Sequence, residues 1–237
     1  MNKHAIKAPF FEVGPKIYLY GQKALELALR AEELSEKYDI DIIFSAQYTD
    51  IAPIAARTHR LHVFAQHMDP VYPGRGVGAV LPEAVADAGA EGVLLNHAER
   101  PLSLSELPQC LIRCRELGLT SLVAAGCAEE SAAAACLKPD IVLAESPRLI
   151  GTGTRSAEDW KEIRRINAAI HKIDPDILIL HGAGIKDDGD VYEVIRQGAD
   201  ATGSTSGILM ADKPYEMMEK MVSALKRAWD ERKRMGE

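Results

Sequence analysis

Short apolar runs alternate with longer amphipathic segments along the chain. Residues 24–34, Ala-Leu-Glu-Leu-Ala-Leu-Arg-Ala-Glu-Glu-Leu, space their apolar side chains as on one face of a helix. The runs Val93–Leu95 and Ile177–Leu180 are apolar throughout, which is typical of parallel strands buried on both faces. The predicted strands are Phe10–Val13, Ile40–Phe44, Leu61–Ala65, Val93–Leu95, Leu119–Ala124, Ile141–Ala144, Ile177–Leu180 and Ala201–Gly203. The predicted helices are Lys23–Tyr38, Asp50–Arg57, Pro82–Ala88, Ser105–Leu117, Glu130–Cys136, Ala157–Ile173, Asp190–Gln197 and Tyr215–Met235.

Strict alternation of strand and helix, with no linker or break in composition, predicts the α/β class and a single (β/α)8 barrel. We expect residues 1–237 to form one domain. The alternative is an open doubly wound sheet. No Gly-x-Gly-x-x-Gly follows the first predicted strand, which argues against a dinucleotide-binding sheet.

Composition narrows the possible partners. The net charge of −7 argues against nucleic acid or an anionic membrane as the main partner. No run approaches the roughly 18–20 apolar residues of a membrane span, and the N-terminal segment lacks the apolar core of a signal peptide. We therefore expect a cytoplasmic protein. Cys110, Cys114, Cys127 and Cys136 match no zinc pattern, so we expect reduced thiols and no metal.

One stretch carries the clearest chemical signal. The apolar run Ile141–Ala144 ends in Glu145, Pro147 follows, and the segment closes on Gly151 and Gly153. A carboxylate at a strand end, beside a loop stiff at its start and flexible at its finish, suits a base next to a closing lid. The alternative interpretation is an ordinary connection from strand to helix.

Other strand ends add to this signal, because in barrels of this type the loops after the strands carry function. Polar or glycine-rich segments follow the first, fourth, seventh and eighth strands, namely Glu12–Lys16, Asn96–Arg100, His181–Ile185 and Ser204–Gly207. We therefore predict that one face of the barrel carries a cation, an imidazole, a carboxylate and two glycine- or serine-rich turns.

This set of motifs resembles the triosephosphate isomerase family in its short archaeal form, over nearly the whole chain. Five segments of the chain match family motifs. Gln66–Pro70 matches Gln-His-x-Asp-Pro, Asn96–Arg100 matches Asn-His-Ser-Glu-Arg, and Glu145–Gly153 matches Glu-Pro-Pro-Glu-Leu-Ile-Gly-Thr-Gly. Gly182–Ile185 matches Gly-Ala-Gly-Ile, and Thr205–Gly207 matches Ala-Ser-Gly. Each match alone is weak, but five in the right order at the right strand ends are specific.

The resemblance implies an isomerase that moves a proton between adjacent carbons of a small phosphorylated sugar. Glu145 would be the base, since desolvation under a lid raises the pKa of a carboxylate. His97 would donate a hydrogen bond to the carbonyl oxygen as a neutral imidazole, a known property of the family. We expect Glu99 and Arg100 to brace their loop or a subunit contact, although the family's matching Glu lines the site. The phosphate would bind backbone amides and one hydroxyl, at Gly151, Gly182, Gly184, Ser206 and Gly207.

The family's first strand ends in Asn-x-Lys, and the match fails there. An alignment without gaps replaces the lysine with Gly14, whereas a shorter first loop places Lys16 on it and restores the charge. We favour Lys16, because a cation near a phosphate stabilises charge in a closed site. The family's Asn is missing in both alignments.

Three other positions depart from the family. Ser146 replaces the proline after the base, and Ala98 replaces the usual Ser. Residues 201–205 are polar where the family has an apolar run. A larger or wetter pocket, for a longer or differently hydroxylated substrate, is one interpretation of this polar strand.

Triose-phosphate isomerisation is the leading hypothesis for function. The alternatives are an isomerase of a four- or five-carbon ketose phosphate and a non-catalytic homologue that binds a phosphosugar. The proton transfers require neither a metal nor an organic cofactor. Family members are oligomers in which the loop after the third strand docks beside a neighbour's active site. The long loop Gln66–Gly78 therefore predicts a homodimer or homotetramer.

Overall fold

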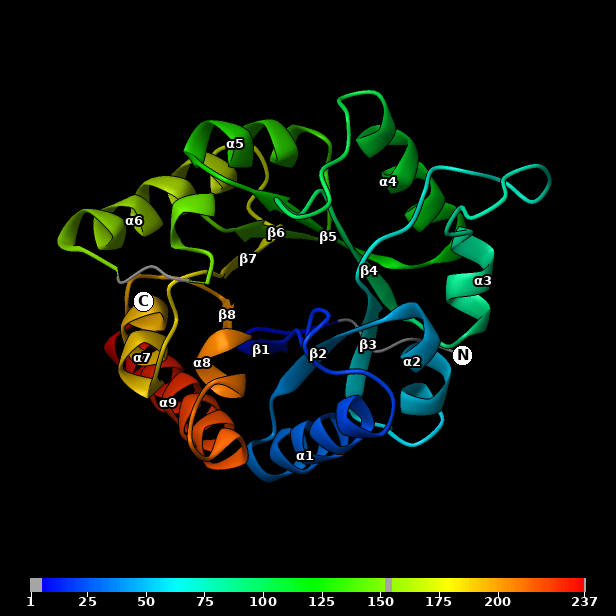
Figure 1. The fold of residues 1–237 in the computed structure, drawn as a ribbon. Helices are drawn as coiled ribbons and strands as arrows, with labels where there is room; N and C mark the ends of the chain where they lie inside the picture. The colour runs from blue at the N-terminus through cyan, green and yellow to red at the C-terminus, as the bar shows by residue number, and fades with distance from the viewer. Residues whose placement is uncertain (1–5, 152–154, 237) are drawn as a thin grey trace.

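The computed structural model describes residues 6–151 and 155–236. Its strands form one closed barrel in which each strand pairs in parallel with the next and β1 also pairs with β8 (Figure 1). The strands are β1 Phe10–Val13, β2 Asp41–Ala46, β3 Leu61–Ala65, β4 Gly92–Leu95, β5 Thr120–Ala125, β6 Ile141–Ala144, β7 Leu178–His181 and β8 Ala201–Gly203. The predicted (β/α)8 barrel is confirmed, and the open-sheet alternative is wrong.

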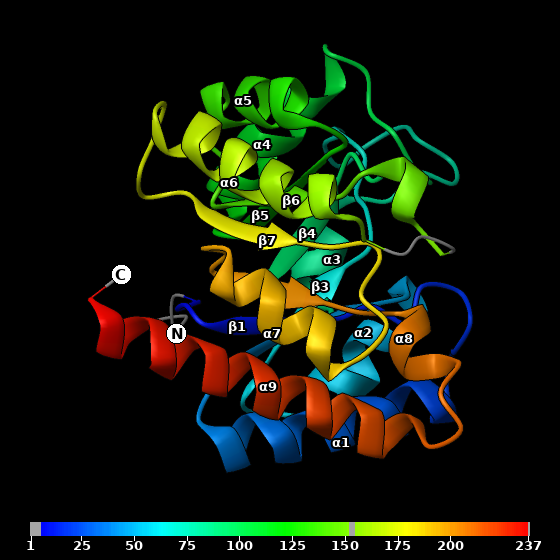
Figure 2. The same cartoon turned by 90° about the vertical axis from the view of Figure 1, so that its left-hand side faces the viewer.

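Helices form the outer ring of the barrel. They are α1 Gln22–Tyr38, α2 Tyr48–Ala55, α3 Pro82–Asp87, α4 Glu106–Leu117, α5 Ala128–Cys136, α6 Ala157–His171, α7 Asp188–Arg196, α8 Ser206–Leu209 and α9 Pro214–Met235. The long C-terminal helix α9 packs between α7 and α1 (Figure 2). No described helix is long and apolar enough to cross a membrane.

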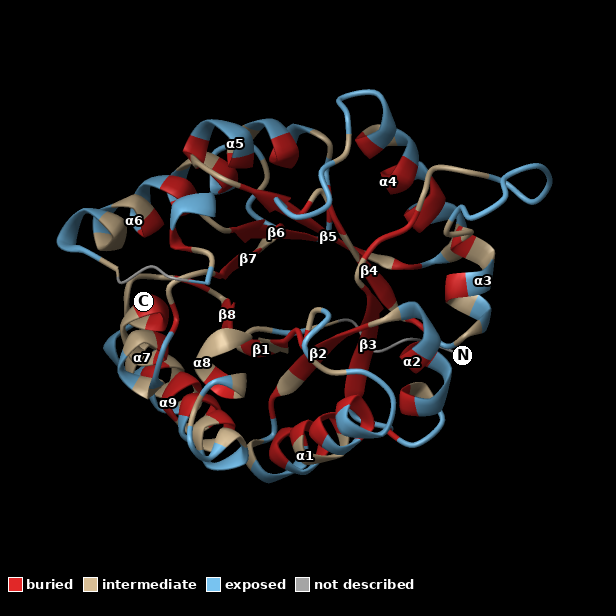
Figure 3. Ribbon diagram, viewed as in Figure 1, coloured by how far each residue is buried: buried red, intermediate tan, exposed pale blue. Residues whose placement is uncertain are grey.

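Each strand contributes to two apolar layers, because successive side chains point to opposite faces of a strand. In β1, Phe10 points into the barrel and packs with interior side chains such as Ile43 and Phe64. Its neighbours Phe11 and Val13 belong to the layer between sheet and helices. Buried residues accordingly follow the strands and the inner faces of the helices (Figure 3). The alternation carries Glu12 into the barrel above Phe10.

The strand and helix boundaries differ by a few residues from those expected. The strand β2 continues past Phe44 because Ser45 and Ala46 pair with Phe64 and Ala65 of β3. A short 3-10 helix, Pro147–Leu149, follows β6, and the four-residue helix α8 follows β8. Neither turn is long enough to produce a periodic apolar pattern.

The polar residues of and after β8 bond to backbone carbonyls of neighbouring segments. The Thr202 hydroxyl donates to the carbonyl of His181 at 2.7 Å, and the Ser204 hydroxyl donates to that of Ile185 at 2.9 Å. The Thr205 hydroxyl donates to the Gly14 carbonyl at 2.5 Å. These hydroxyls therefore tie the end of β8 to the loops after β7 and β1.

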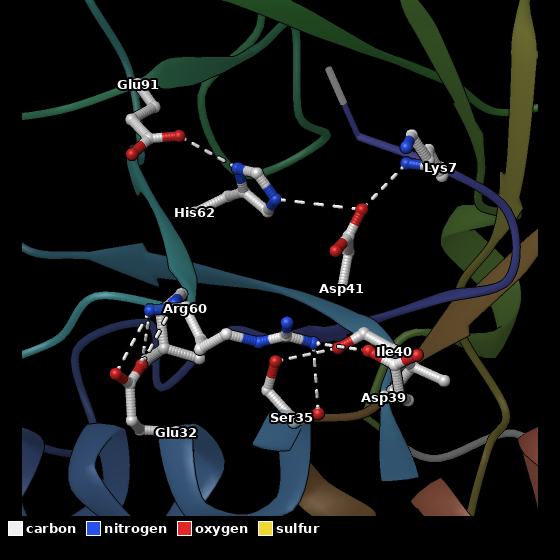
Figure 4. A network of polar contacts seen from close by, with 10 residues as sticks. Lys7, Glu32, Ser35, Asp39, Ile40, Asp41, Arg60, His62 and Glu91 are labelled. Carbon is white, nitrogen blue, oxygen red and sulfur yellow. Dashed lines mark hydrogen bonds and ion pairs between the residues drawn. The ribbon is translucent and has the colours of Figure 1, made fainter. Parts of the chain in front are cut away.

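A polar network lies at the amino ends of β2 and β3, at the other end of the barrel (Figure 4). The Glu32 carboxylate on α1 accepts backbone N–H groups from His59, Arg60 and Leu61, at 2.6–3.0 Å. His62 Nδ1 lies 2.8 Å from Glu91, and its Nε2 lies 3.8 Å from Asp41. Burial would lower the pKa of His62, but the neighbouring carboxylates of Asp41 and Glu91 outweigh it and raise that pKa to about 9.

This network makes stability depend on pH. Because the pKa of folded His62 is about 9 and its ordinary value is 6.5, the imidazolium contributes fully below about pH 6.5 and its contribution is lost as pH rises through 9. We predict that His62→Gln lowers the free energy of unfolding at pH 6 by on the order of 2 kcal/mol. The deficit should shrink by pH 9.5 in urea titrations. The exposed His59 gives the control, since His59→Gln should show no such trend, and a pH-independent deficit in His62→Gln would contradict the assignment.

Candidate active site

A cavity of about 420 Å³ opens at the carboxyl ends of the strands. Its walls come from all eight strands or the loops that follow them, and the loops are where barrels of this type carry their sites. Most of the residues predicted from sequence line it, namely Lys16, His97, Glu99, Arg100, Glu145, Gly151, Gly182, Gly184 and Ser206. Gly207 is not part of the wall. A Cβ there would lie 2.5 Å from the Ile185 carbonyl oxygen, so this glycine permits close packing.

The central contact of the cavity joins Glu145 and His97. Glu145 Oε2 lies 2.8 Å from His97 Nε2, and the two side chains are only 13% and 10% exposed. The Glu145 backbone N–H donates to the Ala125 carbonyl at 2.9 Å, which extends the β5–β6 pairing as far as Glu145. Gly182 leaves room for the carboxyl, since a Cβ there would lie 2.9 Å from Glu145 Oε1.

Backbone hydrogen bonds determine which nitrogen of His97 can donate. The Glu99 N–H donates to His97 Nδ1 at 3.1 Å, and a backbone N–H has no acceptor role. The neutral ring therefore carries its proton on Nε2, the atom beside Glu145. Asn96 fixes the loop, since its side chain donates to the Ala124 carbonyl and accepts the Leu102 N–H, both at 3.0 Å.

Lys16 reaches the cavity from a strained backbone. Its φ is +48°, a conformation that costs a non-glycine residue on the order of 1 kcal/mol or more. The Gln66 amide offsets this strain by donating to the carbonyls of Lys16 and Ser45, both at 3.0 Å. The Lys16 ammonium lies 2.9 Å from Glu99, whose side chain is 58% exposed. A pair this exposed contributes about 0–1 kcal/mol, so an incoming anion can replace Glu99 at little cost.

The segment after Glu145 is anchored at both ends. Leu149 in the 3-10 helix is buried, and Gly151 adopts φ +77°, where a side chain would be strained. Thr152 and Gly153, part of the expected lid, lie outside the described residues. Beyond them Arg155 donates to the carbonyls of Gly182 and Ala183 at 2.6 and 2.9 Å. No sequence pattern predicts these hydrogen bonds between the segment before α6 and the turn after β7.

His181 is placed away from the cavity. It is 1% exposed, and its Nε2 lies 2.7 Å from the side-chain oxygen of Asn167 on α6. Burial, with Arg155 nearby, lowers the pKa of His181 to about 3, so the ring is neutral. We assign it a structural role.

Glu12 is a cavity residue whose chemistry the sequence analysis missed. It points inward from β1 and accepts a hydrogen bond from the Ser45 hydroxyl at 2.7 Å. Burial raises the pKa of Glu12 to about 7; the Ser45 bond opposes this shift and the charge of Glu145 adds to it. The available signal was a lone acid at an inward position of an apolar strand.

The cavity combines a carboxylate base, an imidazole N–H donor and a lysine cation within one enclosure. A carboxylate and a neutral N–H donor can remove a proton next to a carbonyl while the oxygen is hydrogen-bonded. After β7, the consecutive residues Ala183 and Gly184 both have left-handed backbone angles. Such a turn exposes backbone N–H groups that can bind an anion.

Comparisons with known proteins agree with this chemistry. The family model described as "Triosephosphate isomerase" matches residues 15–222. The chain is 38% identical to a triosephosphate isomerase of Sulfolobus acidocaldarius over 231 residues, 96% of this chain and 99% of that protein. It is 36% identical to proteins of the same name from Sulfurisphaera tokodaii, over 96% of this chain and 100% of the relative, and Methanobacterium bryantii, over 92% and 98%.

The hydrogen bond from Glu99 predicts the tautomer of His97. At pH 8 the imidazole should carry its proton on Nε2 in ¹⁵N–¹H NMR spectra. The signal is assigned by its disappearance in His97→Gln. A proton on Nδ1 would contradict the geometry described for this loop.

Proposed function

Since the chain belongs to the triosephosphate isomerase family, we propose that it interconverts glyceraldehyde 3-phosphate and dihydroxyacetone phosphate through an enediolate. The observation that carries this proposal is the 2.8 Å contact between Glu145 and the N–H side of His97 inside the cavity. A substrate that enters between them meets a base and a donor together.

In this mechanism the Glu145 carboxylate removes a proton from the carbon next to the carbonyl. His97 donates its Nε2 proton toward the carbonyl oxygen as negative charge develops there. The protonated Glu145 then returns its proton to the carbon that carried the carbonyl. His97 takes up the proton of the neighbouring hydroxyl in exchange for the one it gives to the former carbonyl oxygen, so the enzyme is unchanged at the end of the isomerisation. Closure of the segment after Glu145 would exclude water and raise the basicity of the carboxylate.

The phosphate group would bind at the opposite side of the cavity. Gly151, Gly182, Gly184 and Ser206 are the proposed contacts, and all four line the wall. Lys16 would exchange its exposed partner Glu99 for the substrate and supply a fixed positive charge. These proton transfers use neither a metal nor an organic cofactor.

A four- or five-carbon ketose phosphate is the competing substrate class. The polar eighth strand had suggested it, but the hydroxyls of Thr202, Ser204 and Thr205 donate to backbone carbonyls and so add no free donor to the cavity. The triose therefore remains the proposed substrate. A panel of phosphosugars tests this, and faster turnover of a longer ketose phosphate would overturn it.

We also infer a single-domain cytoplasmic protein that assembles as a homodimer or homotetramer. The loop after β3 supports assembly, because residues 72–79 are exposed while hydrogen bonds between Asp69 and Val80 close its neck. Its apolar Val77 is fully exposed, and the Tyr72 ring is braced by Arg113 at 3.8 Å. Sedimentation at micromolar concentration should show two or four subunits, and a monomer alone would contradict the inference.

The proposed roles predict distinct kinetic losses in a coupled assay with glyceraldehyde 3-phosphate. Glu145→Gln removes the base and should lower kcat about 10³-fold or more. Lys16→Ala should lower kcat/KM on the order of 100-fold, because it removes the fixed cation.

The matched control is Lys23→Ala, which removes an exposed lysine from α1 and should leave the kinetics unchanged. If turnover survives Glu145→Gln, the proposed base is wrong. If Glu145→Gln loses activity but Lys16→Ala has the kinetics of the wild type, the isomerase proposal is supported and the placement of the family's lysine at Lys16 is wrong.

A further inference from the structure

The mechanism proposed above leaves one half-buried acid in the cavity unused. Glu12 lies in the cavity on β1, directly opposite Gly203 of β8 in the strand register. Acids are rarely buried unless they are paired, yet Glu12 has no basic side chain at hydrogen-bond distance among the described residues. Among the described residues its carboxyl accepts a hydrogen bond from the neutral Ser45 hydroxyl at 2.7 Å.

Two glycines create the space for this carboxyl. A Cβ on Gly14 would lie 2.6 Å from Glu12 Oε1, so the acid occupies the volume that a side chain at position 14 would take. A Cβ on Gly203 would lie 2.5 Å from the Glu12 carbonyl oxygen, 2.8 Å from its Cβ and 2.9 Å from Oε2. Residues 12, 14 and 203 are therefore compatible only as a set.

The charged groups around Glu12 come from three neighbouring loops. They are Glu145 after β6, His97 after β4, and Lys16 after β1, which is paired with Glu99. Burial raises the pKa of Glu12 to about 7; Ser45, His97 and Lys16 lower it, while Glu145 raises it. When Glu145 is ionised as the base, a second carboxylate here would repel both Glu145 and the enediolate.

We propose that Glu12 is a second active-site acid that acts in its protonated form, donating a hydrogen bond to the carbonyl oxygen of the bound sugar phosphate. Ser45 already donates to Oε1, so a proton on Oε2 is the one available to a ligand. A neutral carboxylic acid in a shielded site is an effective donor to an oxyanion. This inference rests on the proposed isomerase function.

The test is the pH profile of kcat/KM. Because the protonated fraction of a group with a pKa of about 7 falls from about one half at pH 7 to about one hundredth at pH 9, the wild type should lose roughly fifty-fold in kcat/KM over this range. Glu12→Gln keeps a donor of the same shape that does not titrate, so its kcat/KM should be a few-fold lower at pH 6.5 but level to pH 9. Glu12→Ala should lose on the order of 100-fold at pH 6.5, mostly in kcat.

A second substitution gives the direction of the shift. Ser45→Ala removes a bond that lowers the pKa of Glu12, so the alkaline loss should move to higher pH. In the Glu12→Gln background, Ser45→Ala should leave the pH profile of kcat/KM unchanged. A profile in Glu12→Gln identical to that of the wild type, or full activity in Glu12→Ala, overturns the inference; thermal melting confirms that each variant is folded.

Calorimetry separates this inference from the proposed reaction. Phosphoglycolate is the probe, because the carboxylate next to its phosphate group offers Glu12 only acceptor oxygens, and it is titrated at pH 7.5 in two buffers of different ionisation enthalpy. If the bound ligand accepts a hydrogen bond from protonated Glu12, the wild type should take up as much as about 0.75 proton more on binding than Glu12→Gln, because a group with a pKa of about 7 is about three-quarters ionised at pH 7.5. Equal uptake overturns the inference even if isomerase activity is robust. Excess uptake without turnover supports Glu12 and contradicts the proposed reaction, and the absence of both binding and turnover contradicts both proposals.

Discussion

Pairing of β1 with both β2 and β8 is the constraint on which the site depends. This strand has four residues, and it closes the barrel through parallel ladders on both edges. Above the ladder the Ser204 N–H donates to the Glu12 carbonyl at 3.2 Å, and Thr205 donates to the Gly14 carbonyl. Closure brings the loops after β1, β4, β6 and β7 around one cavity. Residues separated by more than a hundred positions, such as Lys16 and Glu145, thereby share one wall.

The cavity balances its charges through neighbours rather than through bulk solvent. The cavity is lined by three acidic side chains, Glu12, Glu99 and Glu145, and by two cationic ones, Lys16 and Arg100. Burial raises the pKa of Glu12 to about 7, so about half of this carboxyl is protonated at pH 7, while Glu145 is the carboxyl that contacts His97. Lys16 is occupied by the exposed Glu99, so its charge is held in place yet exchangeable. Base, donor and cation are therefore arranged for an anionic substrate before it binds.

Sequence pattern was sufficient for the barrel because parallel strands buried on both faces produce uninterrupted apolar runs. It also located Glu145 and His97, since each ends a strand of that pattern. Boundaries such as the end of β2 at Ala46 depend on pairing with β3, which no local pattern contains. The polar strand β8 had no explanation until its hydroxyls were seen to bond carbonyls of other segments. Likewise, the alignment without gaps placed Gly14 where the family has its lysine, but it did not show that the Glu12 carboxyl occupies the space that a side chain at position 14 would take.

The central claim is that a carboxylate base moves a proton through an enediolate, and isotope exchange tests it most directly. The wild-type enzyme would convert glyceraldehyde 3-phosphate in D₂O, and dihydroxyacetone phosphate formed in the first turnovers would be analysed by NMR. Because a proton held on Glu145 exchanges with solvent before it is returned, the product should carry deuterium at one hydrogen position of C1. Product without solvent deuterium would indicate direct transfer of hydrogen between the two carbons and would contradict the account.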